Sequence, residues 1–175
     1  MNISLQQFVD ALTQVSVENH IYLNKDTGEF VSITDEDISS AEEFIEDEDA
    51  DWSSLPDWQQ QTYKLVKKVR ALENYLPLPN SMDIGEYNIM QNFCYDISSE
   101  RLRDELLEKI RGKGAFRRFK DTIYHYGIEK EWFRYQSLAY KEIAIDWLEE
   151  HGVTCIDPTF RTLRIEEIAI TDLGA

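Results

Sequence analysis

The sequence lacks the patterns that identify secreted and membrane proteins. It has only two cysteines, Cys94 and Cys155, which are too few for a disulfide framework or a thiolate metal cage. Its apolar runs are only a few residues long, so no segment can span a bilayer as a helix. The first residues contain neither a basic region nor the apolar stretch of a secretory signal. We therefore expect a cytoplasmic protein with reduced thiols and no membrane partner.

Patterns of catalytic and metal-binding residues are also missing. The three histidines, His20, His125 and His151, are far apart, and none forms a His-x-x-x-His or His-Glu-x-x-His pair. Neither Gly-x-Ser-x-Gly nor Cys-x-x-Cys occurs, and no Asp-x-Asp-x-Asp-Gly loop accompanies the many carboxylates. We predict no catalytic residues, no metal site and no cofactor, and we favour a non-enzymatic protein over an enzyme.

Acidic residues outnumber basic ones strongly, with 34 Asp and Glu against 18 Lys and Arg and a formal net charge of -16. Long-range repulsion therefore opposes binding to duplex nucleic acid or to an anionic membrane, whereas a basic protein partner would be attracted. The hydrophobic share of 42% and the aromatic share of 12% are sufficient for a folded core. A chain of 175 residues is long enough for one domain, or for one domain and a small extension.

Residues 35–57, which we call the acid run, contain no Lys or Arg. Mutual repulsion favours a solvated edge for this segment. Trp52 lies within it, and an exposed tryptophan among carboxylates is typical of an anchor for a basic partner. The candidate partner-binding residues are Trp52, Asp47, Glu48, Asp49 and Asp51, and the eleven carboxylates of the run are Asp35, Glu36, Asp37, Glu42, Glu43, Glu46, Asp47, Glu48, Asp49, Asp51 and Asp57.

Residues 109–120, the basic island, contain six Lys and Arg residues, two glycines and no acid. Backbone N–H groups at the start of a helix, together with nearby cations, can hold a phosphate or another anion. The Gly-x-x-x-x-Gly-Lys spacing of a nucleotide-binding loop is absent. The basic island therefore resembles such a loop only in its glycines and its positive charge. The plainer alternative is that the cations pair internally, for example Arg117 with Asp121 one helical turn later. The candidate anion-binding residues are Arg111, Gly112, Lys113, Gly114, Arg117 and Arg118.

In the N-terminal part, apolar spacing predicts an amphipathic helix over residues 4–15 with Ser4 as its cap. Two β-prone runs around Asp26 and Gly28 predict a β-hairpin over residues 20–33. A short helix that begins at Thr34 or Asp35, and a longer helix from Pro56 to about Asn74, are expected to follow.

The two prolines within residues 75–79 require an extended segment, which we take as a subdomain boundary. Four helices are expected beyond it, with an Asp83–Glu86 capping box at the first and Ser98 at the start of the second. Glycines 112, 127 and 152 are expected to end three of these helices. The predicted fold is α+β and mainly α, in which an N-terminal helix and β-hairpin pack on a C-terminal helical bundle.

The expected division of the chain is residues 1–79, residues 80–152, and a C-terminal extension over residues 153–175, all within one compact domain. The extension has β-prone stretches at 153–156 and 160–170 that could add a strand beside the hairpin.

Four segments together resemble Uncharacterised Protein Family 0158 of bacteria: the hairpin 20–32, Glu86-Tyr-Asn-Ile-Met90, the block Arg111-Gly-Lys-Gly-Ala-Phe-Arg-Arg-Phe-Lys-Asp121, and residues 131–150. The resemblance covers about Gln14 to Gly152, and its most specific part is the block from Arg111 to Asp121. The extension after Gly152 departs from the usual family end. The resemblance implies that the basic island and the hairpin are family features and that the setting is bacterial and cytoplasmic, but it transfers no activity or catalytic residue.

Two hypotheses of function follow. The first is a non-enzymatic regulatory or adaptor protein that works through contacts with an unknown protein partner, which would be basic if it met the acid run. The second is a module, or small enzyme, that holds a phosphate, a nucleotide or an RNA end at residues 112–118.

Overall fold

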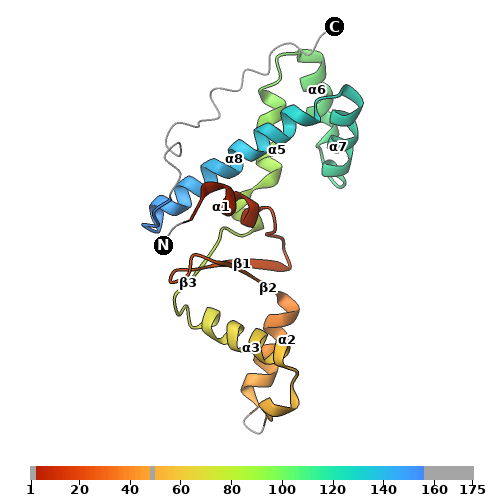
Figure 1. The fold of residues 1–175 in the computed structure, drawn as a ribbon. Coiled ribbons are helices and arrows are strands. Elements are labelled where there is room, and N and C mark those ends of the chain that lie inside the picture. The colour runs from red at the N-terminus through yellow and green to blue at the C-terminus, as the bar shows by residue number, and fades with distance from the viewer. Residues whose placement is uncertain (1–2, 48–49, 156–175) are drawn as a thin grey trace.

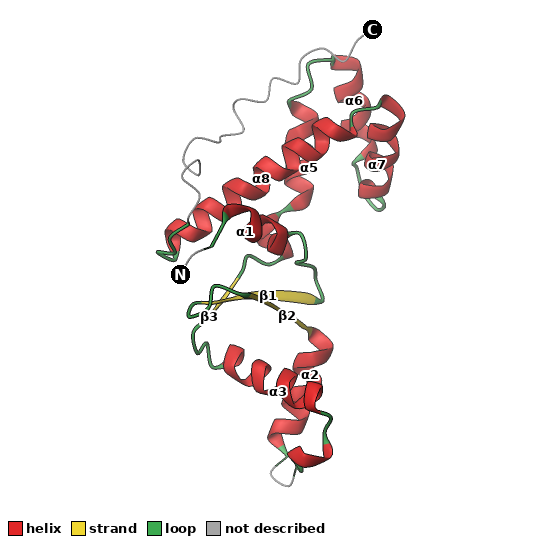
Figure 2. Ribbon diagram, in the orientation of Figure 1, coloured by secondary structure: helices red, strands yellow, loops and turns green. Residues whose placement is uncertain are grey.

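The computed structural model describes residues 3–47 and 50–155 and arranges them in three layers (Figure 1). A small antiparallel sheet lies in the middle, a pair of helices lies on one side of it, and the other helices lie on the opposite side (Figure 2). Helices predominate, which confirms the predicted class of α+β, mainly α. In chain order the elements are α1 (Leu5–Leu12), β1 (Asn19–Asn24), β2 (Phe30–Thr34), α2 (Asp35–Glu46), the 3-10 helix η1 (Trp52–Ser54), α3 (Asp57–Arg70), β3 (Tyr75–Pro77), α4 (Ser81–Ile84), α5 (Glu86–Tyr95), α6 (Glu100–Lys109), α7 (Ala115–Tyr126) and α8 (Glu129–Glu150).

α1 begins after Ser4, as the sequence predicts. The Ser4 hydroxyl accepts a hydrogen bond from the backbone N–H of Gln7 at 3.1 Å, and the Gln7 side-chain oxygen accepts one from the Ser4 N–H at 3.1 Å. This reciprocal cap pairs two of the donors that a helix start leaves free. The apolar face of α1 packs against α8, where the ring centroids of Phe8 and Trp147 are 5.0 Å apart.

The predicted hairpin is confirmed as β1 and β2, and its turn is closed by Asn24. The Asn24 side-chain oxygen accepts hydrogen bonds from the N–H groups of Asp26 at 2.9 Å and Thr27 at 3.3 Å, while Gly28 takes a φ of 77°. Such local bonding and a left-handed glycine are what a tight turn requires. β1 pairs antiparallel with β2 along one edge and with β3 along the other.

β3 is the element that the sequence did not predict as a strand. The extended geometry expected of residues 75–79 is confirmed for Tyr75–Pro77, but these residues pair with β1 to give the strand order β2-β1-β3. A strand added beside the hairpin was expected from the C-terminal extension, and most of that segment lies outside the described residues. Cys155, the last described residue, forms a parallel bridge with Ile3 instead.

The sheet separates two hydrophobic clusters because alternate residues of a strand point to opposite faces. Ile21 and Leu23 of β1 belong to the large cluster with α1, α5 and α8, whereas Tyr22 between them packs against the small cluster. The small cluster lies between the sheet and the α2–α3 pair, with Ala41 and Val66 fully buried. An ion pair between Arg70 and Glu42 joins these two helices.

Two predicted helix starts are wrong by a few residues. The first helix after Pro79 is capped by Asn80, whose side-chain oxygen accepts from the Asp83 N–H at 3.0 Å, while an Asp83 carboxylate oxygen accepts from the Asn80 N–H at 3.1 Å. Asp83 is thus the third residue of α4 and does not cap a helix with Glu86. Gly85, at φ 60°, separates α4 from α5. α6 is capped by Ser99 and not by Ser98, because the Ser99 hydroxyl is the one that accepts from Leu102.

An aromatic cluster joins α5, α7 and α8. Phe93 contacts Phe119, Trp132 and Tyr135 with centroid separations of 5.9, 5.3 and 5.4 Å, all edge to face. Edge-to-face contact aligns the positive edge of one ring with the negative face of the next. α8 also packs against α1, so this long helix has neighbours on more than one side. Glycines 112, 127 and 152 all have positive φ, at 73°, 68° and 62°, as predicted for residues that end helices.

Candidate functional site

The basic island forms the turn between α6 and α7, on the opposite side of the sheet from α2 and α3 (Figure 1). Gly112 and Gly114 lie in the left-handed region, at φ 73° and 80°, so the turn needs glycine at both positions. A Cβ atom at Gly114 would also approach the Nη1 atom of Arg118 to 3.1 Å. The glycines of the island therefore have a structural explanation: they let the chain fold back around one arginine.

Arg118 is directed at the backbone of this turn. Its Nε, Nη1 and Nη2 atoms donate hydrogen bonds to the carbonyl oxygens of Lys109 at 2.9 Å, Lys113 at 2.7 Å and Arg111 at 2.6 Å. The last carbonyls of a helix have no partner within the helix, and Arg118 supplies one for the end of α6 and for the loop beyond it. Three of its donors are thus used within the protein, so its geometry favours a structural role over contact with a ligand.

Arg111, Lys113 and Arg117, by contrast, have exposed side chains. In residues 3–47 and 50–155, none of them takes part in an ion pair. The pairing of Arg117 with Asp121, which helical spacing allowed, is not formed there, as expected for two solvated side chains whose attraction is worth about 0–1 kcal/mol. The island therefore keeps a concentration of positive charge that no described acid neutralises.

Two exposed aromatic residues accompany these cations on α7. Phe116 is 41% exposed and Tyr124 is 76% exposed, and Lys120 lies midway between them in the sequence. Residues four apart share one side of a helix, so the three follow a line along the outer face of α7. An alternating pattern of rings and cations can contact both the bases and the phosphates of a nucleotide.

The acid run occupies α2, η1 and the start of α3, on the other side of the sheet from the basic island (Figure 1). Asp51 caps η1, where one carboxylate oxygen accepts hydrogen bonds from the Ser53 hydroxyl at 2.7 Å and the Ser53 N–H at 2.9 Å. Both bonds favour the ionised form and lower the pKa of Asp51 below its usual value. Asp47 is exposed, whereas Glu48 and Asp49 lie outside the described residues.

The two tryptophans near the acid run, Trp52 and Trp58, differ in exposure. Trp52, expected as an exposed anchor, is half-buried and meets Phe44 edge to face with the ring centroids 5.2 Å apart. Trp58, the second residue of α3, is 65% exposed. The buried positions of α3 are Tyr63, Val66 and Val69, a three-residue spacing that leaves Trp58 off the inner face. That spacing was the signal in the sequence that could have identified it.

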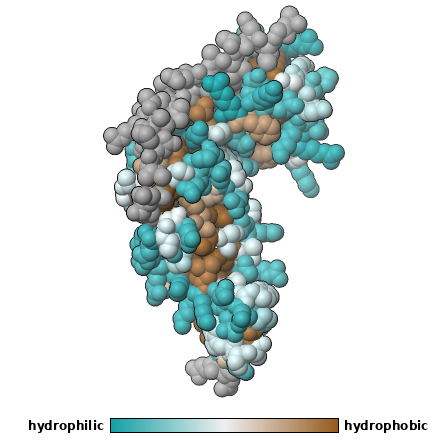
Figure 3. Space-filling view, viewed as in Figure 1, coloured by the Kyte–Doolittle hydropathy of each residue, from teal (hydrophilic) through white to brown (hydrophobic). Residues whose placement is uncertain are grey.

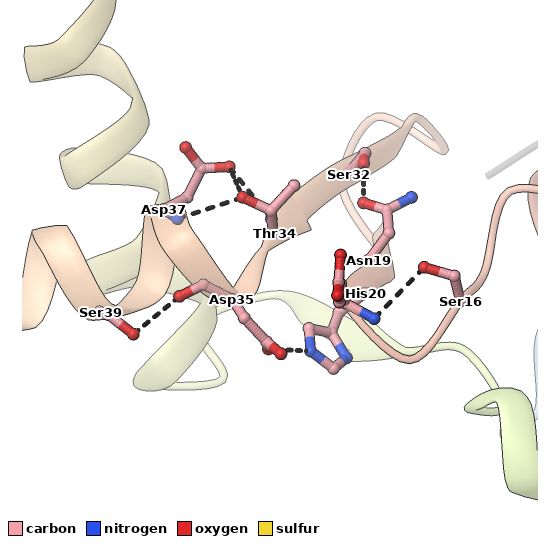
Figure 4. A network of polar contacts seen from close by, with 9 residues as sticks. Ser16, Asn19, His20, Ser32, Thr34, Asp35, Asp37 and Ser39 are labelled. Atoms are coloured by element: carbon pink, nitrogen blue, oxygen red, sulfur yellow. Dashed lines mark hydrogen bonds and ion pairs between the residues drawn. The ribbon is translucent and has the colours of Figure 1, made fainter.

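A second polar network connects the sheet to α2 (Figure 4). The Nε2 atom of His20 on β1 lies 2.7 Å from a carboxylate oxygen of Asp35, and Thr34 and Asp37 form the capping box of α2. The hydroxyl of Ser32 donates to the side-chain oxygen of Asn19 at 2.5 Å. His20 therefore has a carboxylate partner, and in the described residues its ring is not hydrogen-bonded to any of the hydroxyls of this network.

The buried cysteine and tyrosine side chains of the core stay protonated near neutral pH. Burial raises the pKa of Cys94 to about 12, so its thiol stays protonated at neutral pH. Burial and hydrogen bonding to carboxylates also raise the pKa values of Tyr135 and Tyr140; the Tyr140 hydroxyl donates to Glu86 at 2.6 Å. None of these groups is poised to transfer a proton near pH 7.

The described part of the chain contains neither a candidate membrane-spanning helix nor a candidate metal-binding cluster. None of its helices combines the length and the apolar character needed to cross a membrane. Within the same residues, no three His, Cys, Asp or Glu side chains gather so that they could hold a metal ion.

The fold and these surfaces define a mainly helical α+β protein with the acid run and the basic island on opposite sides of its sheet. The chain matches the uncharacterised protein family UPF0158 over residues 1–161 and belongs to that family. This confirms the resemblance found in the sequence, although the match continues beyond Gly152 to residue 161. A UPF0158 protein of Pseudomonas aeruginosa is 27% identical over 78 residues, which cover 44% of this chain and 49% of that protein. The matched part thus spans about half the length of this relative. No solved structure matches the chain significantly.

Proposed function

We propose that this chain is a non-enzymatic adaptor protein of the bacterial cytosol and that a basic protein partner docks on its acid run and on Trp58, the residue that follows the run. The observation that supports this proposal is the 65% exposure of Trp58 directly after the carboxylates of the acid run. Tryptophan is enriched among the few residues that dominate binding energy in protein interfaces. Its ring also attracts Lys and Arg side chains of a partner through the cation–π interaction.

Charge complementarity favours a basic partner. The acid run has eleven carboxylates and no Lys or Arg. Of the nearby cations on α3, Arg70 pairs with Glu42. A partner rich in Lys and Arg would associate faster with this surface at low salt than at high salt, because electrostatic steering is screened by ions.

The test compares two variants that remove exposed aromatic rings. Wild type, Trp58→Ala and Tyr95→Ala, whose ring on α5 is 56% exposed, are immobilised and incubated with lysate of the source bacterium at low and high salt. We expect at least one basic protein to be retained by wild type and Tyr95→Ala and released by Trp58→Ala and by salt. Its affinity for the three proteins is then measured by calorimetry after purification. Equal retention by Trp58→Ala and wild type would refute docking at Trp58.

A second candidate function is the binding of a phosphorylated ligand at the basic island. Its support is that Arg111, Lys113 and Arg117 are exposed and have no ion pair in the described residues, next to the exposed ring of Phe116. We omit Arg118 from this site because three of its donors already bind carbonyl oxygens. Each of the three candidate ligands, a phosphate, a nucleotide or an RNA end, would provide negative charge for these cations. A nucleotide or an RNA end would also provide a base that could stack on Phe116.

Thermal unfolding with a panel of such ligands tests this function. A ligand at about 100 times its Kd stabilises a protein by about 2.7 kcal/mol, which for a chain of this size raises Tm by about 5–10 °C. Lys25→Glu, in the exposed hairpin turn, makes a change of charge equal to that of Arg117→Glu away from the island. We expect Lys25→Glu to keep the shift and Arg117→Glu to lose it. The absence of any shift in wild type would eliminate this function.

A further inference from the structure

A hollow of about 520 Å³ lies where the sheet meets the bundle. Its walls come from β1, the end of β3, the start of α4, the loop after α1 and the last turns of α8. In the space-filling view, hydrophobic surface is exposed on one face at the level of the sheet, between two hydrophilic ends (Figure 3). A volume of this size is within the range of small-molecule pockets, which is about 300–1,000 Å³.

One wall of the hollow is a rigid aromatic ring. Trp147 is 7% exposed and is held from behind by Phe8, at 5.0 Å, and by His151, which stacks on it at 4.1 Å with an interplanar angle of 19°. Leu78 and Pro79 add further apolar surface to the lining. Because its neighbours fix the indole ring, little conformational entropy would be lost when a ligand packs against it.

The charged groups of the lining are of one sign. Asp83 and Glu150 contribute carboxylates, and among the described residues no Lys or Arg lines the hollow. His20 also lines the hollow, and its Nε2 atom lies 2.7 Å from a carboxylate oxygen of Asp35 (Figure 4). One oxygen of Asp83 accepts from Asn80, and neither Asp83 nor Glu150 forms an ion pair within the described residues. A cleft lined by carboxylates on apolar walls concentrates negative potential and attracts cations.

We propose that this hollow binds a small organic cation, namely an alkyl chain that carries two or more amino groups. The ammonium groups would meet the carboxylates of Asp83 and Glu150, and the chain between them would lie on Trp147 and Pro79. This site is distinct from Trp58 and from the basic island, so the two proposed functions can fail without affecting it.

The experiment compares a diamine with an uncharged analogue of the same length. Binding of 1,5-diaminopentane, 1,5-pentanediol and spermidine to the full chain is measured by calorimetry, and the indole N–H resonance of Trp147 locates the ligand by NMR. We expect both amines, but not the diol, to bind and to move the Trp147 resonance. Glu150→Gln should weaken amine binding about tenfold or more, since a charge-assisted hydrogen bond is lost.

Glu149→Gln is the matched control, because Glu149 is the preceding exposed carboxylate on α8 and does not line the hollow. It should bind amines as wild type does. Glu150→Gln is not expected to unfold the protein, because it removes a negative charge from the last turn of a helix, where the dipole disfavours it. Equal binding of the diol and the diamine, wild-type affinity in Glu150→Gln, or an equal loss in Glu149→Gln would each overturn the proposal.

Discussion

Arg118 offers the sharpest test of how the basic island is built. Replacement by alanine removes three hydrogen bonds to the carbonyl oxygens of Lys109, Arg111 and Lys113. Hydrogen bonds to a charged group contribute about 1.5–3 kcal/mol each. Arg118 is only half-buried, so water replaces part of this stabilisation. We expect Arg118→Ala to lower the free energy of unfolding by about 2–4 kcal/mol, and Tm by roughly 5–15 °C.

Urea denaturation followed by circular dichroism measures this loss, with Arg117→Ala as the control. Arg117 is its exposed neighbour with no ion pair in the described residues, so its replacement should change stability by about 0.5 kcal/mol or less. Arg118→Lys should recover only part of the loss, because one ammonium group cannot span three carbonyls as a planar guanidinium does. If Arg118→Ala were no less stable than Arg117→Ala, the structural role of Arg118 would be wrong.

Three further predictions concern the core, the thiols and the acid run. Phe93→Ala should destabilise the protein by about 3–5 kcal/mol in urea, since it opens a cavity among three rings, whereas exposed Tyr124→Ala should change stability by about 0.5 kcal/mol or less; similar losses would contradict the aromatic core. With a pKa of about 12, Cys94 should have about one thiolate in ten thousand at pH 8, so a thiol reagent should modify it only at the rate of unfolding, and Cys94→Ser should leave the fast reaction of the chain unchanged. The lowered pKa of Asp51 means that its folded form binds a proton less readily than the unfolded chain, so its stabilisation is present above the usual Asp pKa and is lost as pH falls through the lowered value. The stability difference between wild type and Asp51→Asn should therefore shrink as the pH falls below the usual pKa of Asp, and a constant difference would refute the assignment.

The features that the sequence predicted correctly are those that depend on neighbours in the chain. Ser4 caps α1, Gly28 permits the hairpin turn, and Gly127 ends α7, because each relies on backbone geometry within about four residues. The apolar stripe of a helix follows from the same local periodicity. Even the displaced cap of α6 differs by a single residue, from Ser98 to Ser99.

The features that the sequence missed depend on contacts between distant segments. β3 becomes a strand because β1 offers a free edge some fifty residues earlier; Leu76 is paired with Leu23. Trp52 is half-buried because the ring of Phe44 on α2 covers it, which no local pattern reveals. Arg118 is a residue type that commonly binds anions. Only the fold of the α6–α7 turn shows that its guanidinium donates to backbone carbonyl oxygens instead. Residue type indicated where charge lies, but tertiary structure decides which charges face solvent.

The separation of the two charged ends has a consequence for both proposed functions. The sheet and its two hydrophobic clusters lie between the acid run and the basic island, so neither end can neutralise the other within one molecule (Figure 1). At physiological salt, the Debye length is about 8 Å, so a ligand at the island senses mainly the nearby cations and not the net charge of -16. At low salt, that net charge acts at longer range and should oppose anions while it attracts cations. Moderate salt should therefore weaken the binding of a basic partner at Trp58. The same salt should strengthen the binding of an anion at Arg117, because it screens the long-range repulsion from the net charge. Opposite initial responses of the two affinities to salt would show that the two surfaces act independently.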